Sequence, residues 1–207
     1  MRPLPRLHAV TDAVVLAHPD LGIQAAAIAA AGSAVALHVR DRTAGGAALA
    51  GVALRFLALA RPPEASVFVN GRPDLAAAVA ADGVQLSATD LTPADARRVF
   101  SRGWIGRSVH SETEAETAVA EGADYLLVGS VFPSASHPGQ PAVGLNLVRY
   151  AASLGKPVIA IGGMDPDRAA EAHAAGAYGV AAISALWQAP DPAAAALALL
   201  EPWLAGV

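Results

Sequence analysis

The feature that most constrains this chain is a pattern that recurs along its length. An Ala-rich amphipathic helix is followed by a glycine or small-residue stop and then by a short, continuous apolar run. Gly32 thus precedes residues 34–39, Gly122 precedes residues 125–129, and Gly176 precedes residues 180–183. A glycine just past a helix adopts the left-handed cap conformation without a steric penalty. Apolar runs without two-residue alternation are typical of strands buried on both faces, so the pattern predicts helices alternating with parallel strands.

Strand candidates occur at residues 7–11, 34–40, 66–70, 84–86, 104–108, 125–131, 157–161 and 179–183, with helical stretches between them. Helix starts are indicated by Thr92 and Asp165, each followed by proline, and by a capping box of Ser111 with Glu114. Eight strand–helix units in 207 residues give about 26 residues per unit, near the lower limit for a (β/α)8 barrel. We therefore predict an α/β fold, a compact single-domain (β/α)8 TIM barrel over residues 1–207. A doubly wound open sheet is the alternative.

Composition excludes several classes of site and partner. The chain has no cysteine, which excludes disulfides, thiolate metal sites and cysteine nucleophiles. A formal net charge of −4 gives no electrostatic argument for binding nucleic acid or an anionic membrane. The apolar stretches fall short of the ~20 residues of a membrane span, and residues 1–10 lack the apolar region of a secretory signal. We expect a cytoplasmic protein with no nucleic-acid or membrane partner. No metal-type partner spacing is present at His8, His18 or His173.

Polar residues occupy one face of the second predicted strand and continue beyond its end. His38, Arg40 and Arg42 share this face because side chains alternate along a strand. In a barrel the active site lies at the C-terminal ends of the strands. If the face points inward, two guanidiniums reach the mouth of the barrel, which suits an anionic ligand. The alternative is a solvated arginine pair with Asp41 as its surface partner.

Two turns with small residues follow the seventh and eighth predicted strands. Gly162 and Gly163 precede one helix, and Ile183 with Ser184 begins the other turn. Backbone N–H groups in such turns approach a ligand closely, and a helix N-terminus favours negative charge. Phosphate sites in this fold commonly use these two loops. The sequence therefore predicts a phosphate-binding mouth.

A long polar segment, residues 133–144, follows the sixth predicted strand and exceeds the usual length of such loops. It is either a lid that excludes water or a surface excursion. His137 lies within it and is of a residue type that titrates near neutral pH. Ser130 shares the strand face of Leu126 and Val128, so we expect it to point into the barrel near its top. Other polar residues at or just beyond strand ends include Asn70, Asp90 and Ser108.

The motifs at these positions resemble those of the thiamine phosphate synthase and TenI-type thiazole tautomerase superfamily. The matching segments are residues 38–42 (His-Val-Arg-Asp-Arg), 69–70, 81–86, 105–111, 128–132 and 160–168, and together the resemblance covers nearly the whole chain. It implies a TIM barrel that acts in thiamine biosynthesis on a small-molecule partner, a phosphorylated thiazole. The motifs are specific to the superfamily and separate its two branches less well.

The synthase branch joins a pyrimidine pyrophosphate to a thiazole phosphate and expels pyrophosphate with Mg²⁺. The resemblance implies diphosphate binding by Arg40 and Arg42, pyrimidine contacts from Asn70 and Ser108, Mg²⁺ binding by Asp90, lid contacts from Ser134, Ser136 and His137, and thiazole-phosphate binding by Gly162, Gly163, Ile183 and Ser184. Two departures count against this branch. Gly71 stands where the family has a second metal-binding aspartate, and His137 replaces the lid lysine. Because charge on pyrophosphate needs a divalent ion and cationic clamps, these losses weaken the synthase interpretation.

The tautomerase branch moves a proton on a carboxylated thiazole phosphate to give the aromatic isomer, without metal or other cofactor. Residues 106–111, residues 163–168 and His38 resemble it, but Ser130 replaces its catalytic histidine. A neutral serine is a poor general base because its pKa lies far from the working pH. We therefore hypothesise that His137 and His38 are the acid/bases and that Ser130 orients the ring or its carboxylate.

Three functions are open at this point. We favour a tautomerase-like isomerase and take the Mg²⁺-dependent synthase, a transferase, as the alternative. A non-catalytic paralogue that binds a thiazole or thiamine phosphate comes third, motivated by the loss of a metal ligand and of the tautomerase histidine. Fold alone does not choose among them. The sequence is compatible with a homo-oligomer and does not decide the oligomeric state.

Overall fold

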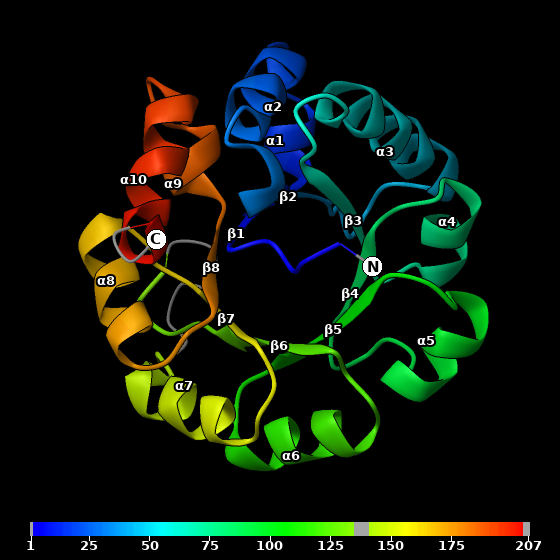
Figure 1. Cartoon of the computed structure of the whole chain (residues 1–207). Helices are drawn as coiled ribbons and strands as arrows, with labels where there is room; N and C mark the ends of the chain where they lie inside the picture. Colours follow the sequence, from blue (N-terminus) through cyan, green and yellow to red (C-terminus); the bar gives the residue numbers. More distant parts are fainter. Residues whose placement is uncertain (1, 135–140, 205–207) are drawn as a thin grey trace.

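The structure is a computed structural model that describes residues 2–134 and 141–204. Its strands are β1 (Leu7–Val10), β2 (Val35–Val39), β3 (Ser66–Asn70), β4 (Gly83–Leu86), β5 (Trp104–Val109), β6 (Tyr125–Gly129), β7 (Val158–Ile161) and β8 (Gly179–Ala182). Each strand pairs in parallel with the next, and β8 pairs with β1, so the sheet closes into a barrel (Figure 1). Every predicted strand is present within two residues of its expected bounds. The barrel prediction is confirmed, and the open-sheet alternative is wrong.

Helices surround the barrel on its outside, as Figure 1 shows. They are α1 (Ala13–Leu16), α2 (Leu21–Ala29), α3 (Gly46–Ala60), α4 (Pro73–Ala78), α5 (Pro93–Val99), α6 (Glu112–Ala120), α7 (Gly144–Ser153), α8 (Pro166–Ala174), α9 (Ser184–Trp187) and α10 (Pro192–Leu204), with a 3-10 turn η1 (Gly32–Ala34) before β2. In the described part of the chain, none of these helices has the length and apolar character needed to cross a bilayer.

The predicted helix starts carry the side-chain caps that their sequences favour. Thr92 and Asp165 each accept a hydrogen bond from the backbone N–H three residues further on. Ser111 Oγ accepts from the Glu114 N–H, while the Glu114 carboxylate accepts from the backbone N–H of His110 rather than that of Ser111. Each cap pairs a backbone N–H that the first turn leaves without an intrahelical partner, a contribution of about 1 kcal/mol.

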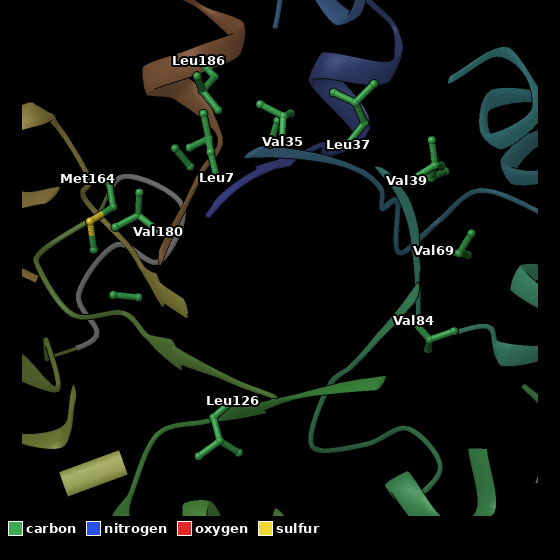
Figure 2. Close-up of a cluster of buried hydrophobic side chains, with 14 of the residues drawn as sticks. Leu7, Val35, Leu37, Val39, Val69, Val84, Leu126, Met164, Val180 and Leu186 are labelled. Carbon is green, nitrogen blue, oxygen red and sulfur yellow. The ribbon is translucent and has the colours of Figure 1, made fainter. Parts of the chain in front are cut away.

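Strand residues alternate between two faces, and the larger buried cluster lies on the outer face, between the strands and the helices. Figure 2 shows members of this cluster pointing away from the barrel centre, among them Leu7, Val35, Leu37, Val39, Val69, Val84, Leu126 and Val180. By the same alternation the smaller cluster fills the barrel interior, including Val10, Ala36, Phe68, Tyr125, Leu127, Ile159 and Ala181. Both strand faces are therefore buried, which explains the continuous apolar runs in the sequence.

Two interior glycines leave room for large rings. A Cβ atom at Gly83 would lie 2.5 Å from the Phe68 ring, and one at Gly106 would overlap the Tyr125 ring and the Gln85 side chain. Barrel interiors are filled by layers of side chains at high density, so a small residue must face a large one. The interior is consequently a packed core rather than a channel.

The segment before β1 covers the N-terminal end of the barrel. The Trp104 indole N–H donates to the Arg2 carbonyl at 3.0 Å, and the Tyr178 hydroxyl donates to the Leu4 carbonyl at 2.8 Å. Trp104 begins β5 and Tyr178 directly precedes β8, so the segment crosses the barrel from one side to the other (Figure 1). The opposite, C-terminal end of the strands is where ligands bind in this fold.

Candidate functional site

The predicted site residues lie on the rim formed by the C-terminal ends of the strands, the barrel mouth. Arg40 and Arg42 follow β2, Asn70 ends β3, Asp90 follows β4, Ser108 lies near the end of β5, Ser130 follows β6, Gly162 and Gly163 follow β7, and Ile183 and Ser184 follow β8. Ser134 is half-buried in the segment after β6. Ser136 and His137 lie outside the described residues. The closed barrel thus brings residues that are far apart in sequence to one rim.

Two guanidiniums lie at the β2 edge of the mouth. Arg40 is half-buried, and its backbone N–H donates to Thr11 Oγ1 at 2.8 Å, which ties the ends of β1 and β2 together. Burial and then the positive charge of Arg42 lower the pKa of Arg40, while Asp12 and Asp41 act in the opposite direction. Two guanidiniums, one of them partly desolvated, therefore lie close enough to interact, with the carboxylates of Asp12 and Asp41 nearby. A guanidinium pair of this kind can bind a multiply charged anion.

The carboxylate of Asp90 is held at the mouth by the turn after β4. Its Oδ2 accepts hydrogen bonds from the Ser87 N–H at 2.6 Å and the Ser87 hydroxyl at 2.8 Å. Gly71, directly after β3, has φ of +71°, and a Cβ atom there would lie 3.3 Å from Asp90 Oδ1. Glycine at this position therefore leaves space in front of the carboxylate. Among the described residues no group of three or more His, Asp or Glu side chains is arranged to hold a metal ion.

Ser108 on β5 is positioned by a buried side-chain amide from the adjacent strand β4. The Gln85 side chain donates from Nε2 to Ser108 Oγ at 3.0 Å and to the Leu86 carbonyl at 3.1 Å. Gln85 is almost completely buried, whereas Ser108 is half-buried. The hydroxyl of Ser108 accepts from Gln85 and keeps its own proton available for a ligand at the mouth.

His38 points into the barrel interior, as predicted, but it is enclosed there rather than open to the mouth. Its Nδ1 lies 3.0 Å from Asn70 Oδ1, and its Nε2 lies 2.8 Å from His8 Nδ1. Desolvation lowers the pKa of His38 to about 4, against a weaker opposing effect of the Asn70 hydrogen bond. Burial, followed by the charge of His38, lowers the pKa of His8 as well. Both rings are therefore neutral near pH 7.

The expectation for Ser130 was wrong about the strand face. Leu126 and Val128 belong to the outer cluster, and Leu126 points toward the helices in Figure 2. Side chains alternate along the strand, so the inward residues of β6 are Tyr125, Leu127 and Gly129. Strand alternation stops at Gly129, and the Ser130 side chain lies against Gly162, where a Cβ atom would come within 2.8 Å of Ser130 Oγ. Ser130 therefore lies at the mouth because it packs against the turn after β7, which the alternation of strand residues does not predict.

The turn after β7 is tight and needs its two glycines. Gly162 and Gly163 have φ of +105° and +63°, conformations that residues with a Cβ rarely adopt. The Arg168 guanidinium donates to the Gly163 carbonyl at 2.6 Å, and it also lies over the Phe132 ring at 5.2 Å. These contacts fix the turn immediately before α8, whose N-terminal end is an anion-favouring position.

His8 is the site residue that sequence reasoning missed. It is fully buried on the inward face of β1 and is in contact with His38, which the pattern did identify. The available signal was a single histidine between two apolar residues, Leu7 and Ala9, in a strand whose other face is apolar. A polar side chain inside such a strand must find a partner across the interior.

Comparison of amino-acid sequences identifies the family. The family described as thiamine monophosphate synthase matches residues 7–186, which contain every described strand. A protein named thiamine-phosphate synthase from Thermus thermophilus is 50% identical over 149 residues, 71% of this chain and 72% of that protein. Proteins of the same name from Methanoculleus marisnigri and Salinispora arenicola are 40% and 41% identical, covering 94% and 97% of this chain and 93% and 98% of those proteins.

Solved structures agree with this result. Thiamine phosphate pyrophosphorylase from Pyrococcus furiosus is similar with a TM-score of 0.82 and 32% identity, covering 95% of this chain and 94% of that one. A 3-hexulose-6-phosphate synthase structure has a TM-score of 0.67 at 19% identity, a likeness that shows the fold alone. The chain therefore belongs to the thiamine monophosphate synthase family.

Proposed function

We propose that this protein is a thiamine biosynthesis enzyme, specifically a thiamine-phosphate synthase that joins a pyrimidine pyrophosphate to a thiazole phosphate and releases pyrophosphate. The names of the relatives support this synthase reaction over the tautomerase reaction that the sequence motifs placed first. Two lines of structural reasoning support it further. One concerns the charges at the mouth, and the other concerns the environment of His38.

The observation that carries the proposal is the guanidinium pair on the β2 edge, with Arg40 partly desolvated beside Arg42. When pyrophosphate leaves, negative charge accumulates on its oxygens as the bond to the pyrimidine methylene breaks. Fixed cations next to the leaving group stabilise that charge more in the transition state than in the ground state. In this proposal Arg40 and Arg42 bind the diphosphate and lower the barrier to its departure.

Asp90 fits the role of magnesium ligand. Mg²⁺ is commonly held by one or two carboxylates together with substrate phosphates, so a single aspartate at a phosphate site is sufficient. The space left by Gly71 in front of Asp90 Oδ1 is where a cation and its water molecules would be accommodated. The ion would neutralise charge on the pyrophosphate when bound. Ser87 holds the Asp90 carboxylate in place through two hydrogen bonds to Oδ2.

The remaining mouth residues divide between the two substrates. We assign the pyrimidine side to Asn70 on β3 and Ser108 on β5, the strands on either side of β4, and each side chain is oriented by a buried partner. The thiazole phosphate is assigned to the turns after β7 and β8, through Gly162, Gly163, Ile183 and Ser184, at the starts of α8 and α9. Ser134, Ser136 and His137, from the segment after β6, are assigned contacts with the bound substrates; Ser136 and His137 lie outside the described residues.

The tautomerase alternative has weaker support in the described residues. Its two candidate acid/bases are His137, which lies outside the described residues, and His38. His38 has no solvent exposure, and both of its ring nitrogens have partners. A general base must reach the proton that it takes and needs a pKa near the operating pH. With a pKa of about 4 and no free nitrogen, His38 meets neither condition.

A product assay tests the proposal. The purified protein is given pyrimidine pyrophosphate and thiazole phosphate, with Mg²⁺ or with a chelator, and products are separated by chromatography. Thiamine phosphate that forms only with Mg²⁺ is the expected result. Conversion of the carboxylated thiazole phosphate to its aromatic isomer without Mg²⁺, and without thiamine phosphate, would support the tautomerase instead. Tight binding of thiazole phosphate with neither product would support the non-catalytic paralogue.

A further inference from the structure

A continuous line of hydrogen-bonding groups runs through the barrel interior from its N-terminal end to the mouth. The Pro5 carbonyl lies 3.1 Å from His8 Nε2, His8 Nδ1 lies 2.8 Å from His38 Nε2, and His38 Nδ1 lies 3.0 Å from the Asn70 amide atom placed as Oδ1. Both histidines have no solvent exposure, while Asn70 is half-buried at the rim. The line therefore joins a backbone carbonyl below the core to a side chain that faces the substrate site.

Counting the protons along this line determines which group donates and which accepts at each contact. Its contacts need one proton each, and the Pro5 carbonyl can only accept, so His8 must carry its proton on Nε2. His8 Nδ1 is then an acceptor, which requires His38 to carry its proton on Nε2. His38 Nδ1 is in turn an acceptor and needs a donor from Asn70. Two neutral imidazoles supply two of the protons, and the third comes from the amide NH₂ group.

The assignment of amide oxygen and nitrogen follows from this count, because the two atoms are distinguished by their hydrogen bonds. With the oxygen toward His38 and both rings neutral, one of the contacts at 2.8 to 3.1 Å would join two lone pairs. A charged imidazolium would remove that conflict. Burial against Phe68 and Tyr125 disfavours it, and so does the second ring beside it.

We propose that His8 and His38 are positioning residues that hold the Asn70 amide with its nitrogen toward His38 and its carbonyl oxygen toward the mouth. The oxygen is then a fixed hydrogen-bond acceptor, suited to an amino group on a heteroaromatic ring. This second part rests on the proposed function, in which an aminopyrimidine is the ligand. The first part concerns only the protein.

Nitrogen NMR tests the first part without any substrate. Two-bond ¹H–¹⁵N correlations distinguish rings protonated at Nε2 from those protonated at Nδ1, and spectra of His8→Asn and His38→Gln identify the two signals among six histidines. The expected result at pH 7 is neutral Nε2–H rings for both His8 and His38. An Nδ1–H form of either ring, or a doubly protonated ring, would overturn the proposal.

Kinetics test the second part. His8→Leu removes the acceptor that fixes His38, and it is expected to raise KM for the pyrimidine substrate about 10-fold while KM for the thiazole phosphate stays unchanged. His8→Asn keeps an acceptor near the position of Nδ1 and should recover most of the loss. Equal increases in both KM values, or no increase, would contradict a positioning role. If the wild type makes no thiamine phosphate while the NMR result holds, the proposed function fails and the amide orientation stands.

Discussion

A Cβ atom at Gly71 would lie 3.3 Å from Asp90 Oδ1, so the glycine keeps one side of this carboxylate open. The sequence motif suggested a lost metal ligand at this position, since the family has an aspartate there. The geometry gives two reasons for a glycine here. Its backbone has φ of +71°, and its missing side chain leaves space beside Asp90, the one carboxylate that the proposed reaction assigns to Mg²⁺. Substitution by alanine, compared with a control glycine, separates the cost of backbone strain from the crowding of Asp90.

Gly71→Ala is expected to raise the Mg²⁺ concentration needed for half-maximal activity by about 10-fold, because the methyl group crowds Asp90. The positive φ also costs about 1 kcal/mol of unfolding free energy. Gly122→Ala is the matched control, since Gly122 has φ of +87° and open space around its Cβ position. Both variants should lose similar stability in urea denaturation, and only Gly71→Ala should change the Mg²⁺ titration. An unchanged titration in Gly71→Ala would remove Asp90 from the metal site.

Arg40→Gln is expected to lower kcat/KM for the pyrimidine pyrophosphate by about 10- to 100-fold, since a hydrogen bond to a charged group contributes about 1.5–3 kcal/mol. The reason is the loss of a half-buried cation beside the leaving group. Arg102→Gln serves as the control because Arg102 is exposed before β5, at the other end of the barrel. Steady-state kinetics measure both. Equal activity of Arg40→Gln and the wild type would contradict the diphosphate assignment.

Gly106→Ala is expected to destabilise the protein by about 1–3 kcal/mol, because the new methyl group would overlap the enclosed Tyr125 ring. Gly51→Ala, on the exposed side of α3 with open space at its Cβ position, should instead stabilise by about 0.5–1 kcal/mol. Urea denaturation of the two variants compares the same substitution in opposite surroundings. A Gly106→Ala variant as stable as the wild type would mean that the interior is less tightly packed than described.

Stability should depend on pH through His38. The folded pKa is about 4 and the unfolded value is 6.5, so between these values the unfolded chain binds more protons. Unfolding free energy is therefore highest above pH 6.5 and falls as the pH drops toward 4, by about 3 kcal/mol from this residue. Burial of His8 acts in the same direction. Urea denaturation at several pH values should show the decline in the wild type and a smaller one in His38→Gln. Identical profiles would show that His38 is not buried in its neutral form.

Much of the fold could be predicted because each strand is marked by local chemistry. The run of residues 66–70 and the glycine stops identify strands whose two faces are both buried, and the number of units suits a closed barrel. Thr92 and Asp165 identify helix starts because their caps involve only nearby residues. Signals of this kind need no knowledge of distant parts of the chain.

The site residues could be predicted from the sequence only where they lie at the ends of strands. Arg40 and Asn70 were identified because they lie at strand ends. The prediction for Ser130 was wrong about the strand face, because it took the outward-facing Leu126 and Val128 as inward and because alternation stops at Gly129. His8 was missed because its partner His38 lies 30 residues away, and only the pairing of β1 with β2 brings the rings together. Contacts across the interior depend on register and packing, which no local pattern contains.

The central claim is that the barrel mouth supports diphosphate release and the joining of two rings. Phosphorus NMR of one reaction with both substrates and Mg²⁺ tests it most directly, since the diphosphate ester, free pyrophosphate and thiazole monophosphate give separate signals. The account predicts that the ester signal is replaced by free pyrophosphate in equal amount to thiamine phosphate, while the monophosphate on the thiazole is retained. If the diphosphate ester signal persists while the thiazole phosphate is only isomerised, the claim is contradicted.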